Sequence, residues 1–380
     1  MTTPEHVEPA ELAARIEDGR RVHLLDVRNR DEVDAWRIRG PGVALTHVPY
    51  MQFLSANATG DPAELVDTGD SYVAVCPRGE ESAEVAEMLT DAGVDVRNLA
   101  GGMHGWARVY VRAELESDES GPSIFQYRRP ASGCLAYAII SAGEAVLVDP
   151  LRAFTARYLD DLAAMGAELT HVLDTHIHAD HFSGVPDLTA ETDATALVSA
   201  DAAERGVSFD VETVSDGDEI EVGDAEVRVL STPGHTTGAI SLLVGDVLLS
   251  GDSLFLDGTP RPDLQSAEAD PRGLAEQLHE SLTERLAGLP EETTVAPGHI
   301  PPERTPMDGL HADSLGKLRE RIPAFLQDRE TFVERILDSL GSPPANYEQI
   351  IAVNLGQEGV SEDDAFELEL GPNNCAVAAE

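Results

Sequence analysis

The sequence predicts an α/β protein made of two successive blocks, and two observations carry this prediction. At 380 residues the chain has the length of two or three domains of about 100–200 residues each. Apolar runs of strand length alternate with stretches of helical periodicity, and strands that alternate with helices indicate a parallel sheet. The first block, at residues 7–113, contains expected strands at 22–27, 72–75 and 96–99 and expected helices at 9–18 and 82–92.

The second block, at residues 123–380, follows a polar stretch at residues 114–122 that has the composition of a linker. It opens with a predicted hairpin of two strands, Leu135–Ile140 and Ala145–Asp149. Further strands are expected at residues 171–175, 196–199, 226–232, 239–244 and 247–250. A helix is expected at residues 153–165, and residues 312–340 are expected to be mostly helical despite Pro323. The second block therefore also mixes strands with helices.

The chain is strongly acidic, with 70 acidic against 26 basic residues and a formal net charge of −44. This charge is spread over globular sequence and is not collected in a tail. One interpretation is an ordinary solvated surface. The more specific one is a halophilic protein adapted to multimolar salt, where a Debye length of about 3 Å screens self-repulsion. The charge argues against nucleic acid or an anionic membrane as a partner.

Cysteine use and the N-terminal residues bear on the compartment. Cys76, Cys134 and Cys375 do not look like a disulfide framework. Residues 1–15 contain acidic residues and lack the basic-then-apolar run of a signal peptide. No stretch approaches the roughly 18 apolar residues of a membrane span. We therefore expect a cytoplasmic protein with reduced thiols.

A dense histidine run follows the expected strand at residues 171–175. It contains His176, His178, Asp180 and His181, and three further candidates each follow a strand and a tight turn: His235, Asp252 and His299. Imidazoles and carboxylates packed this closely are costly to bury unless a cation lies among them. Because His and Asp are fitting ligands for zinc or iron, the pattern predicts a metal site where several strands end.

Residues from about 123 to 300 resemble the metallo-β-lactamase superfamily, which implies an αββα sandwich. The motifs match in order at Asp149, the His176–His181 run, His235, Asp252 and His299. Two groups of the superfamily fit best, glyoxalase II and persulfide dioxygenase, and both carry all seven ligand-type residues. The stretch Arg261-Pro262-Asp263, the opening Ser132–Tyr137 and the ending Gly371–Ala376 are similar to persulfide dioxygenases.

The resemblance to persulfide dioxygenase implies one Fe(II) per chain, bound by His176, His235 and Asp252 as a two-His-one-carboxylate set with open positions for O₂ chemistry. The remaining candidates would then line the pocket without a second metal: His178, Asp180, His181 and His299. Arg261 would hold the anionic end of the substrate, with Asp263 fixing it; the alternative is a purely structural pair of these two side chains. A glyoxalase II-like enzyme would instead use all seven ligands for two zinc ions.

The first block resembles a rhodanese domain in three places. Leu25–Arg28 matches the opening signature, Leu99–Gly102 with Trp106 matches the closing one, and Cys76–Ser82 lies where rhodaneses carry their active-site loop. Loop N–H groups and a helix N-terminus can stabilise a thiolate or persulfide anion at Cys76. A cysteine before a Pro-Arg-Gly turn is also a poor core position, so we expect Cys76 to handle sulfane sulfur.

The loop departs from the rhodanese pattern at its end, where Glu80 and Glu81 stand and many rhodaneses have an arginine. These carboxylates should raise the pKa of the Cys76 thiol and repel anionic donors such as thiosulfate. Arg78 compensates in part and is a candidate for substrate binding. A neutral or protein-bound persulfide is therefore the better sulfur donor. The alternative is a rhodanese block that only senses sulfide or docks a partner.

Together, the two blocks predict an enzyme that oxidises a low-molecular-weight thiol persulfide, glutathione-like or built on another thiol, with O₂ to sulfite. Cys76 and Arg261 would be its catalytic residues. The alternative is a dinuclear zinc thioester hydrolase of the glyoxalase II type with a non-catalytic or sensing rhodanese block. Metal content discriminates between them, because one iron per chain favours the dioxygenase and two zinc ions favour the hydrolase. The oligomeric state stays open, a homo-oligomer included.

Overall fold

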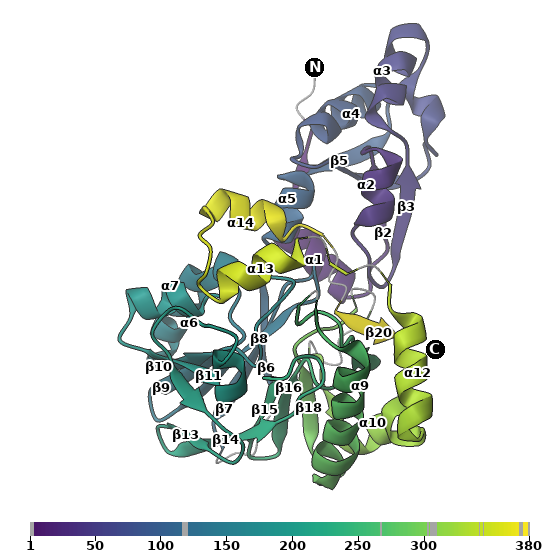
Figure 1. Ribbon diagram of the computed structural model, residues 1–380. Coiled ribbons are helices and arrows are strands. Elements are labelled where there is room, and N and C mark those ends of the chain that lie inside the picture. Colours follow the sequence, from purple (N-terminus) through teal and green to yellow (C-terminus); the bar gives the residue numbers. More distant parts are fainter. Residues whose placement is uncertain are drawn as a thin grey trace.

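The computed structural model describes the chain except for residues 1–3, 116–120, 267, 302–303, 305–309, 342, 345, 372–374 and 379–380. It confirms an α/β fold with a smaller N-terminal part and a larger second part (Figure 1). Residues 116–120 of the expected linker and residues 372–374 of the C-terminal motif lie outside the described residues.

The N-terminal part is built on a five-stranded sheet in the order β1-β5-β4-β2-β3. Its strands are β1 His6–Val7, β2 Val22–Asp26, β3 Val43–His47, β4 Ser71–Val75 and β5 Asp95–Leu99. Its helices are α1 Pro9–Glu17, α2 Arg30–Ala35, α3 Tyr50–Thr59, α4 Glu80–Asp91 and α5 Gly102–Ala107, with a 3-10 turn η1 at Pro62–Leu65. All pairings are parallel, which confirms the expected parallel sheet with flanking helices.

The second part contains two larger sheets. The seven-stranded sheet holds β6 Val111–Leu115, β7 Ser123–Arg128, β8 Leu135–Ser141, β9 Glu144–Val148, β10 Glu168–Leu173, β11 Thr195–Ser199 and β12 Glu212–Val214. The six-stranded sheet holds β13 Glu219–Val222, β14 Ala225–Ser231, β15 Ile240–Val244, β16 Val247–Gly251, β18 Thr294–Pro297 and β19 Asp313–Ser314. A short ribbon pairs β17 Gly258–Pro260 with β20 Ala376–Ala378.

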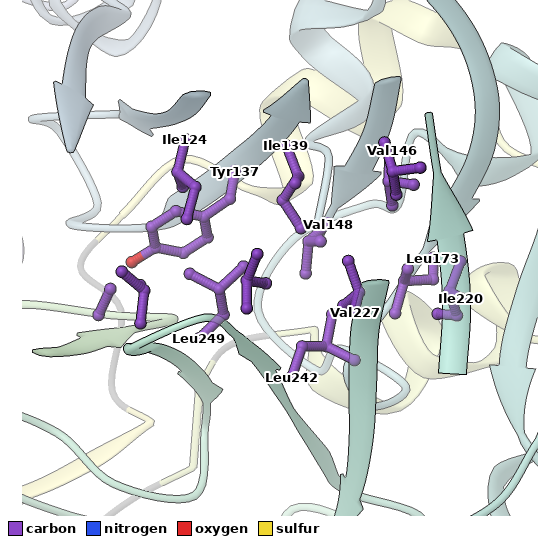
Figure 2. Packing of buried hydrophobic residues seen from close by; sticks show 14 of the residues in the cluster. Ile124, Tyr137, Ile139, Val146, Val148, Leu173, Ile220, Val227, Leu242 and Leu249 are labelled. Atoms are coloured by element: carbon purple, nitrogen blue, oxygen red, sulfur yellow. The ribbon is translucent and has the colours of Figure 1, made fainter. Parts of the chain in front are cut away.

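The main core lies between these two sheets. Figure 2 shows Ile139, Val146 and Leu173 of the seven-stranded sheet facing Val227 and Leu242 of the six-stranded sheet. Helices α6 Thr155–Met165 and α7 Val185–Glu191 pack on the outer face of the first sheet. Helices α9 Pro271–Glu280, α10 Leu315–Arg321 and α12 Arg329–Ser339 pack on the outer face of the second. The layers therefore form the αββα sandwich implied by the sequence resemblance.

The C-terminal helices follow the sandwich in the chain. The expected helical stretch at residues 312–340 is divided into α10, α11 Pro323–Leu326 and α12. Pro323 causes the first break, because it holds Ile322 in an extended conformation with φ −80° and ψ 123°. The remaining helices are α8 Ala200–Ala203, α13 Tyr347–Asn354 and α14 Glu362–Leu368, with turns η2 Arg152–Phe154, η3 Ser281–Arg285 and η4 Leu286–Gly288. Among the helices of the described residues, none combines the length and apolar character needed to cross a membrane.

The seven-stranded sheet begins earlier in the chain than the expected second block. Strand β6 pairs antiparallel with β7, from Val111 opposite Arg128 to Leu115 opposite Ile124. Glu114 and Leu115, which were expected in the linker, therefore belong to a strand. The polar composition of this stretch suggested a linker. Pairing with β7 and burial of Leu115 in the core between the two sheets make it a strand instead.

The two parts touch through buried polar and apolar contacts. The Trp36 indole N–H donates to the Ala131 carbonyl at 2.9 Å, and the Arg129 Nε donates to the Ala107 carbonyl at 2.9 Å. Ala131 and Phe366 lie in the same apolar cluster as the core of the N-terminal part. Helix α14 is therefore in contact with both parts, as its place between them in Figure 1 also indicates.

Candidate metal centre

Five strand ends bring the predicted ligand residues to one edge of the sandwich. Asp149 follows β9, the His176–His181 run follows β10, His235 follows β14, Asp252 follows β16 and His299 follows β18. Strands β9 and β10 are parallel neighbours, and so are β16 and β18, so the carboxyl ends of each pair meet at one edge. None of the candidate ligand side chains is more than 4% exposed.

His176, His235 and Asp252 form one compact group. The Asp252 Oδ2 lies 3.9 Å from the His176 Nε2 and 3.8 Å from the His235 Nε2. One ligand atom from each residue lies within 4.8 Å of the other two. These three atoms are buried and have no hydrogen-bond partner among the described residues. Two imidazole nitrogens and one carboxylate oxygen left without partners in this way fit a divalent metal ion.

The other polar atom of each of these three side chains is held in place. The His235 Nδ1 lies 2.7 Å from the Arg261 carbonyl, which fixes the ring with its Nε2 toward Asp252. The His176 Nδ1 lies 3.1 Å from the Thr175 hydroxyl, and the Asp252 Oδ1 lies 2.6 Å from the His299 Nδ1. Such contacts orient metal ligands. Thr175 has no motif in the sequence, so sequence reasoning missed it.

Burial keeps two of these imidazoles neutral. It lowers the pKa of His176 well below its ordinary value, and the neighbouring His178 and His235 lower that pKa further. Burial also lowers the pKa of His235, and this outweighs the attraction of the Asp252 carboxylate. Neutral imidazole is the form that binds a metal. The electrostatics of this group therefore agree with its geometry.

One ring nitrogen of His178 points toward two carboxylates, whereas its Nδ1 is buried without a hydrogen-bond partner among the described residues. Its Nε2 lies 3.1 Å from the Asp149 Oδ1 and 3.6 Å from the Asp174 Oδ1. Burial lowers the pKa of His178, but the two carboxylates outweigh burial and raise that pKa to about 9. Asp149 also accepts the N–H of Thr175 at 2.6 Å and its hydroxyl at 2.9 Å. Asp149 therefore fixes the start of the histidine run.

A second group of ligand-type residues surrounds one oxygen of Asp180. The Asp180 Oδ2 lies 2.9 Å from the His299 Nε2, 3.3 Å from the His181 Nδ1 and 3.4 Å from the Cys134 Sγ. Burial lowers the pKa of His299, but Asp252 and Asp180 raise it well above its ordinary value. His299 thus bridges two carboxylates through both ring nitrogens. Sequence reasoning noted Cys134 only as part of a motif and did not place it here.

The Arg261 guanidinium is buried and paired. Its Nε and Nη2 donate to the two Asp263 oxygens at 2.7 and 2.8 Å, and the Nη2 also donates to the Gly341 carbonyl at 2.7 Å. The side chain is 4% exposed. These contacts agree with the alternative that Arg261 and Asp263 form a purely structural pair. The backbone carbonyl of Arg261 contacts the metal group separately, through the His235 Nδ1. Substrate binding by Arg261 and Asp263 stays a prediction.

Cys76 lies where β4 ends, but it is part of the core. Its exposed fraction is 1%, so the expectation that this turn is a poor core position was wrong. The sulfur accepts the Gly79 N–H at 3.0 Å and lies 3.1 Å from the Ser82 hydroxyl. Gly102, with φ +56°, is required beside it, because a Cβ there would lie 2.1 Å from the Cys76 carbonyl oxygen.

The electrostatics of the Cys76 loop match the expected direction. Burial raises the pKa of the Cys76 thiol most, the Ser82 and Gly79 hydrogen bonds lower it, and Glu81 raises it further. Arg78 lies at the surface. Its side chain is 67% exposed, and its guanidinium pairs with Glu367 at 3.3 Å. A role for Arg78 in substrate binding stays a prediction.

Comparisons with known proteins agree with this architecture. The family model described as the metallo-beta-lactamase superfamily matches residues 129–299, and the rhodanese-like domain model matches residues 8–109. A hydroxyacylglutathione hydrolase from Methylococcus capsulatus is 35% identical over 237 residues, which cover 59% of this chain and 87% of that protein. A persulfide dioxygenase from Bos taurus is 28% identical over 202 residues, covering 53% and 73% of the two chains.

A solved structure gives the same result. The crystal structure of ETHE1 from Myxococcus xanthus is 31% identical, has a TM-score of 0.53, and matches 65% of this chain and 100% of its own. The names of these two relatives refer to a hydroxyacylglutathione and to a persulfide. The αββα layers, the buried ligand groups and these matches lead to one conclusion: the chain belongs to the metallo-β-lactamase superfamily and carries an N-terminal rhodanese-like domain.

Proposed function

We propose that the protein oxidises a low-molecular-weight thiol persulfide to sulfite at a mononuclear Fe(II) bound by His176, His235 and Asp252. In the balanced reaction, one persulfide, one O₂ and one water give one thiol, one sulfite and two protons. The rhodanese-like domain would supply or receive the sulfane sulfur at Cys76. The relatives include both dioxygenases and hydrolases, so the proposal depends on the geometry of this chain.

The observation that carries the proposal is the different state of the seven candidate ligands. His176, His235 and Asp252 each present one buried atom that lacks a partner among the described residues. His178 and His181 also each keep one buried ring nitrogen without such a partner, whereas His299 uses both ring nitrogens on carboxylates. Because His299 is engaged in this way, we take the compact group of His176, His235 and Asp252 as the metal site in preference to a seven-ligand set.

The residues around this group support the proposed reaction in defined ways. Two histidines and one carboxylate leave coordination positions open, and Fe(II) in such a set supplies O₂ activation. The Arg261 carbonyl and the Thr175 hydroxyl orient the two imidazoles. His299, held between Asp252 and Asp180, is placed to keep a proton beside the metal group. The burial of every ligand excludes bulk water from the reacting groups.

Cys76 is proposed to take the sulfane sulfur from a neutral or protein-bound persulfide. The Gly79 N–H stabilises negative charge on its sulfur, and the Ser82 hydroxyl shares its single proton between that sulfur and the Asn98 Oδ1, at 3.1 and 2.7 Å. Burial and Glu81 oppose a free thiolate. If replacing Cys76 by Ser leaves protein persulfidation and coupled turnover unchanged, the rhodanese-like domain only senses or docks.

The first test compares metal content and oxygen uptake in two variants. His235→Gln removes a proposed ligand, so we expect this variant to lose its bound iron. We also expect it to take up no oxygen when it is assayed with glutathione persulfide in high salt. His178→Gln removes a histidine of the same run that is paired with Asp149, so we expect it to retain one iron per chain. Metal analysis and an oxygen electrode measure both properties. Equal loss of metal in both variants, or no uptake by iron-loaded protein, would contradict the proposal.

A dinuclear zinc thioester hydrolase is the second candidate. The group formed by Cys134, Asp180, His181 and His299 favours it, because these ligand atoms also lie within 4.8 Å of one another. If the protein is such a hydrolase, we expect protein loaded with two zinc ions to hydrolyse a hydroxyacylglutathione thioester. We expect His178→Gln to abolish that activity. Thioester hydrolysis followed by ultraviolet absorbance decides between the two candidates.

A further inference from the structure

The loop that carries the histidine run is closed by a side chain from the far end of the chain. Asn354, the last residue of α13, is 4% exposed. Its Nδ2 donates to the backbone carbonyls of His178 at 3.0 Å and His181 at 2.8 Å, and its Oδ1 accepts the Ser183 N–H at 2.9 Å. A single amide therefore binds the backbone of the loop at three points.

A buried carboxylate supplies the next contact along the same loop. Glu369, which directly follows α14, accepts the Phe182 N–H on its Oε1 at 2.7 Å. Its Oε2 accepts a hydrogen bond from the Arg129 Nη1 at 2.8 Å, and the side chains of Glu369 and Arg129 are 1% and 2% exposed. Arg129 in turn donates to the Ala107 carbonyl of the rhodanese-like domain. The metal loop is thus tied through Glu369 to the N-terminal part.

The helix before Glu369 also contacts the Cys76 loop. Glu367 of α14 lies 3.3 Å from the Arg78 guanidinium and 3.5 Å from the His104 ring. The first turn of α5 binds the same loop, because the Met103 N–H donates to the Cys76 carbonyl at 2.9 Å. One C-terminal segment therefore touches the loops of both candidate sites.

We propose that Asn354 and Glu369, here named the C-terminal clamp, are positioning residues of the metal centre. The backbone from His176 to Ser183 forms no helix and almost no sheet pairing, so its buried N–H and carbonyl groups need other partners. The clamp supplies partners for two carbonyls and two N–H groups. Because the clamp begins at the His178 carbonyl, two residues after the proposed ligand His176, it sets the direction of the histidine run and with it the place of the His176 ring.

The inference concerns the metal centre whichever metal and reaction it serves, so its test uses metal binding and not turnover. In Asn354→Asp the shape of the side chain is kept, but two N–H donors become an oxygen that faces the His178 and His181 carbonyls. We expect the affinity for Co(II), measured by competition with a chelator, to fall about 10–100-fold, as for other residues that orient ligands. The visible absorption of bound Co(II) should shift, because the ligand geometry changes.

Asn346→Asp is the matched control. Asn346 is the N-cap residue of the same helix and donates to the Leu368 carbonyl; this hydrogen bond is exposed and is not made to the metal loop. We expect unchanged Co(II) affinity and absorption in this variant. Asn354→Gln keeps both the donor and the acceptor groups, so it should recover part of the affinity. Thermal melting of each metal-free variant separates positioning from general destabilisation.

Glu369→Gln provides a second variant, with Glu367→Gln as its control. The amide introduced by Glu369→Gln can still accept the Phe182 N–H but loses the ion pair with Arg129, so a smaller fall in Co(II) affinity is expected, of about tenfold or less. Glu367→Gln should leave the affinity unchanged. If Asn354→Asp does not fold, this second pair decides. The proposal would be overturned if folded Asn354→Asp bound Co(II) with wild-type affinity and absorption, or if the Asn346→Asp control lost as much affinity. Where Glu369→Gln decides, an unchanged affinity in that variant would overturn it.

Discussion

Gly298, the residue before His299, controls how closely two strand ends can approach. A Cβ at this position would lie 2.6 Å from the Asp252 Oδ1 and 3.0 Å from the Gly251 carbonyl carbon. The Gly298 N–H also donates to the Gly251 carbonyl at 2.8 Å. Backbone atoms cannot yield to a methyl group as a flexible side chain can. Because Gly298 has no side chain, the Asp252 carboxylate can lie close to the backbone at this position.

Gly298→Ala should consequently weaken metal binding without altering any ligand. The new methyl group would meet the Asp252 Oδ1 and force this carboxylate to shift, so we expect the metal affinity to fall about 10–100-fold. Gly288→Ala is the control, because a Cβ there meets nothing within 4 Å. Titration with Co(II) measures both variants. Equal affinities would show that the approach of the two strand ends is not limiting.

The meeting of the candidate ligands at one edge of the sandwich was predictable, because each follows a strand and a short turn, a pattern that can be recognised in the sequence alone. It cannot predict Thr175, Cys134 or Asn354 as neighbours of the site. Asn354 lies 176 positions from His178, and no local pattern marks an asparagine that binds a distant backbone. The burial of Cys76 was also missed, since the turn after it suggested exposure and the apolar cluster around it includes Phe53 of α3, which no local pattern places beside Cys76.

At the scale of whole elements, long apolar strands were predicted more reliably than short helices. The strands β2, β4, β5 and β8 to β11 all lie at or beside their expected positions. The elements α2, β3 and α3 were not expected. Helix α2 has six residues with only Val33 buried, so its amphipathic pattern is too short to recognise. Its position is instead fixed by a capping box between Asn29 and Glu32.

Replacing Asn29 with Ala tests that account of α2. The Glu32 carboxylate accepts the Asn29 N–H at 3.0 Å, and the Asn29 side chain accepts the N–H of Glu32. Because the substitution removes the cap, we expect the free energy of unfolding to fall by about 1 kcal/mol. Asn57→Ala, in the exposed interior of α3, should not destabilise the protein. Denaturant unfolding followed by circular dichroism measures both changes; a loss of equal size in the control would contradict the capping account.

At the scale of the whole molecule, the surface is dominated by carboxylates. The chain has 70 acidic and 26 basic residues, and the large apolar side chains exposed among the described residues are Leu45, Met51 and Leu326. Uncompensated negative charge opposes the compact state when salt does not screen it. The exceptions are buried carboxylates such as Asp149, Asp252 and Glu369, which take part in the ligand groups and in the C-terminal clamp.

Salt concentration should therefore change the stability strongly. We expect the melting temperature to rise between dilute buffer and molar KCl, because the Debye length shortens from about 30 Å at 0.01 M to about 3 Å at 1 M. Sucrose at equal osmolarity is the control, since it is uncharged and screens nothing. Differential scanning calorimetry provides the measurement. A melting temperature that is as high in dilute buffer as in KCl would show that the surface charge is not an adaptation to salt.

The histidine loop is translated well before its hydrogen-bond partners from the C-terminal segment, which determines when the metal centre can form. The Phe182 N–H binds Glu369, which the ribosome adds 187 residues later, and Arg261 donates its N–H to Cys375. At the usual rate of about 5–20 residues per second, the loop is translated roughly ten to forty seconds before its partners exist. The rhodanese-like domain can fold in that interval, whereas the metal centre cannot take its final form. Metal insertion should therefore follow translation of the C-terminal segment.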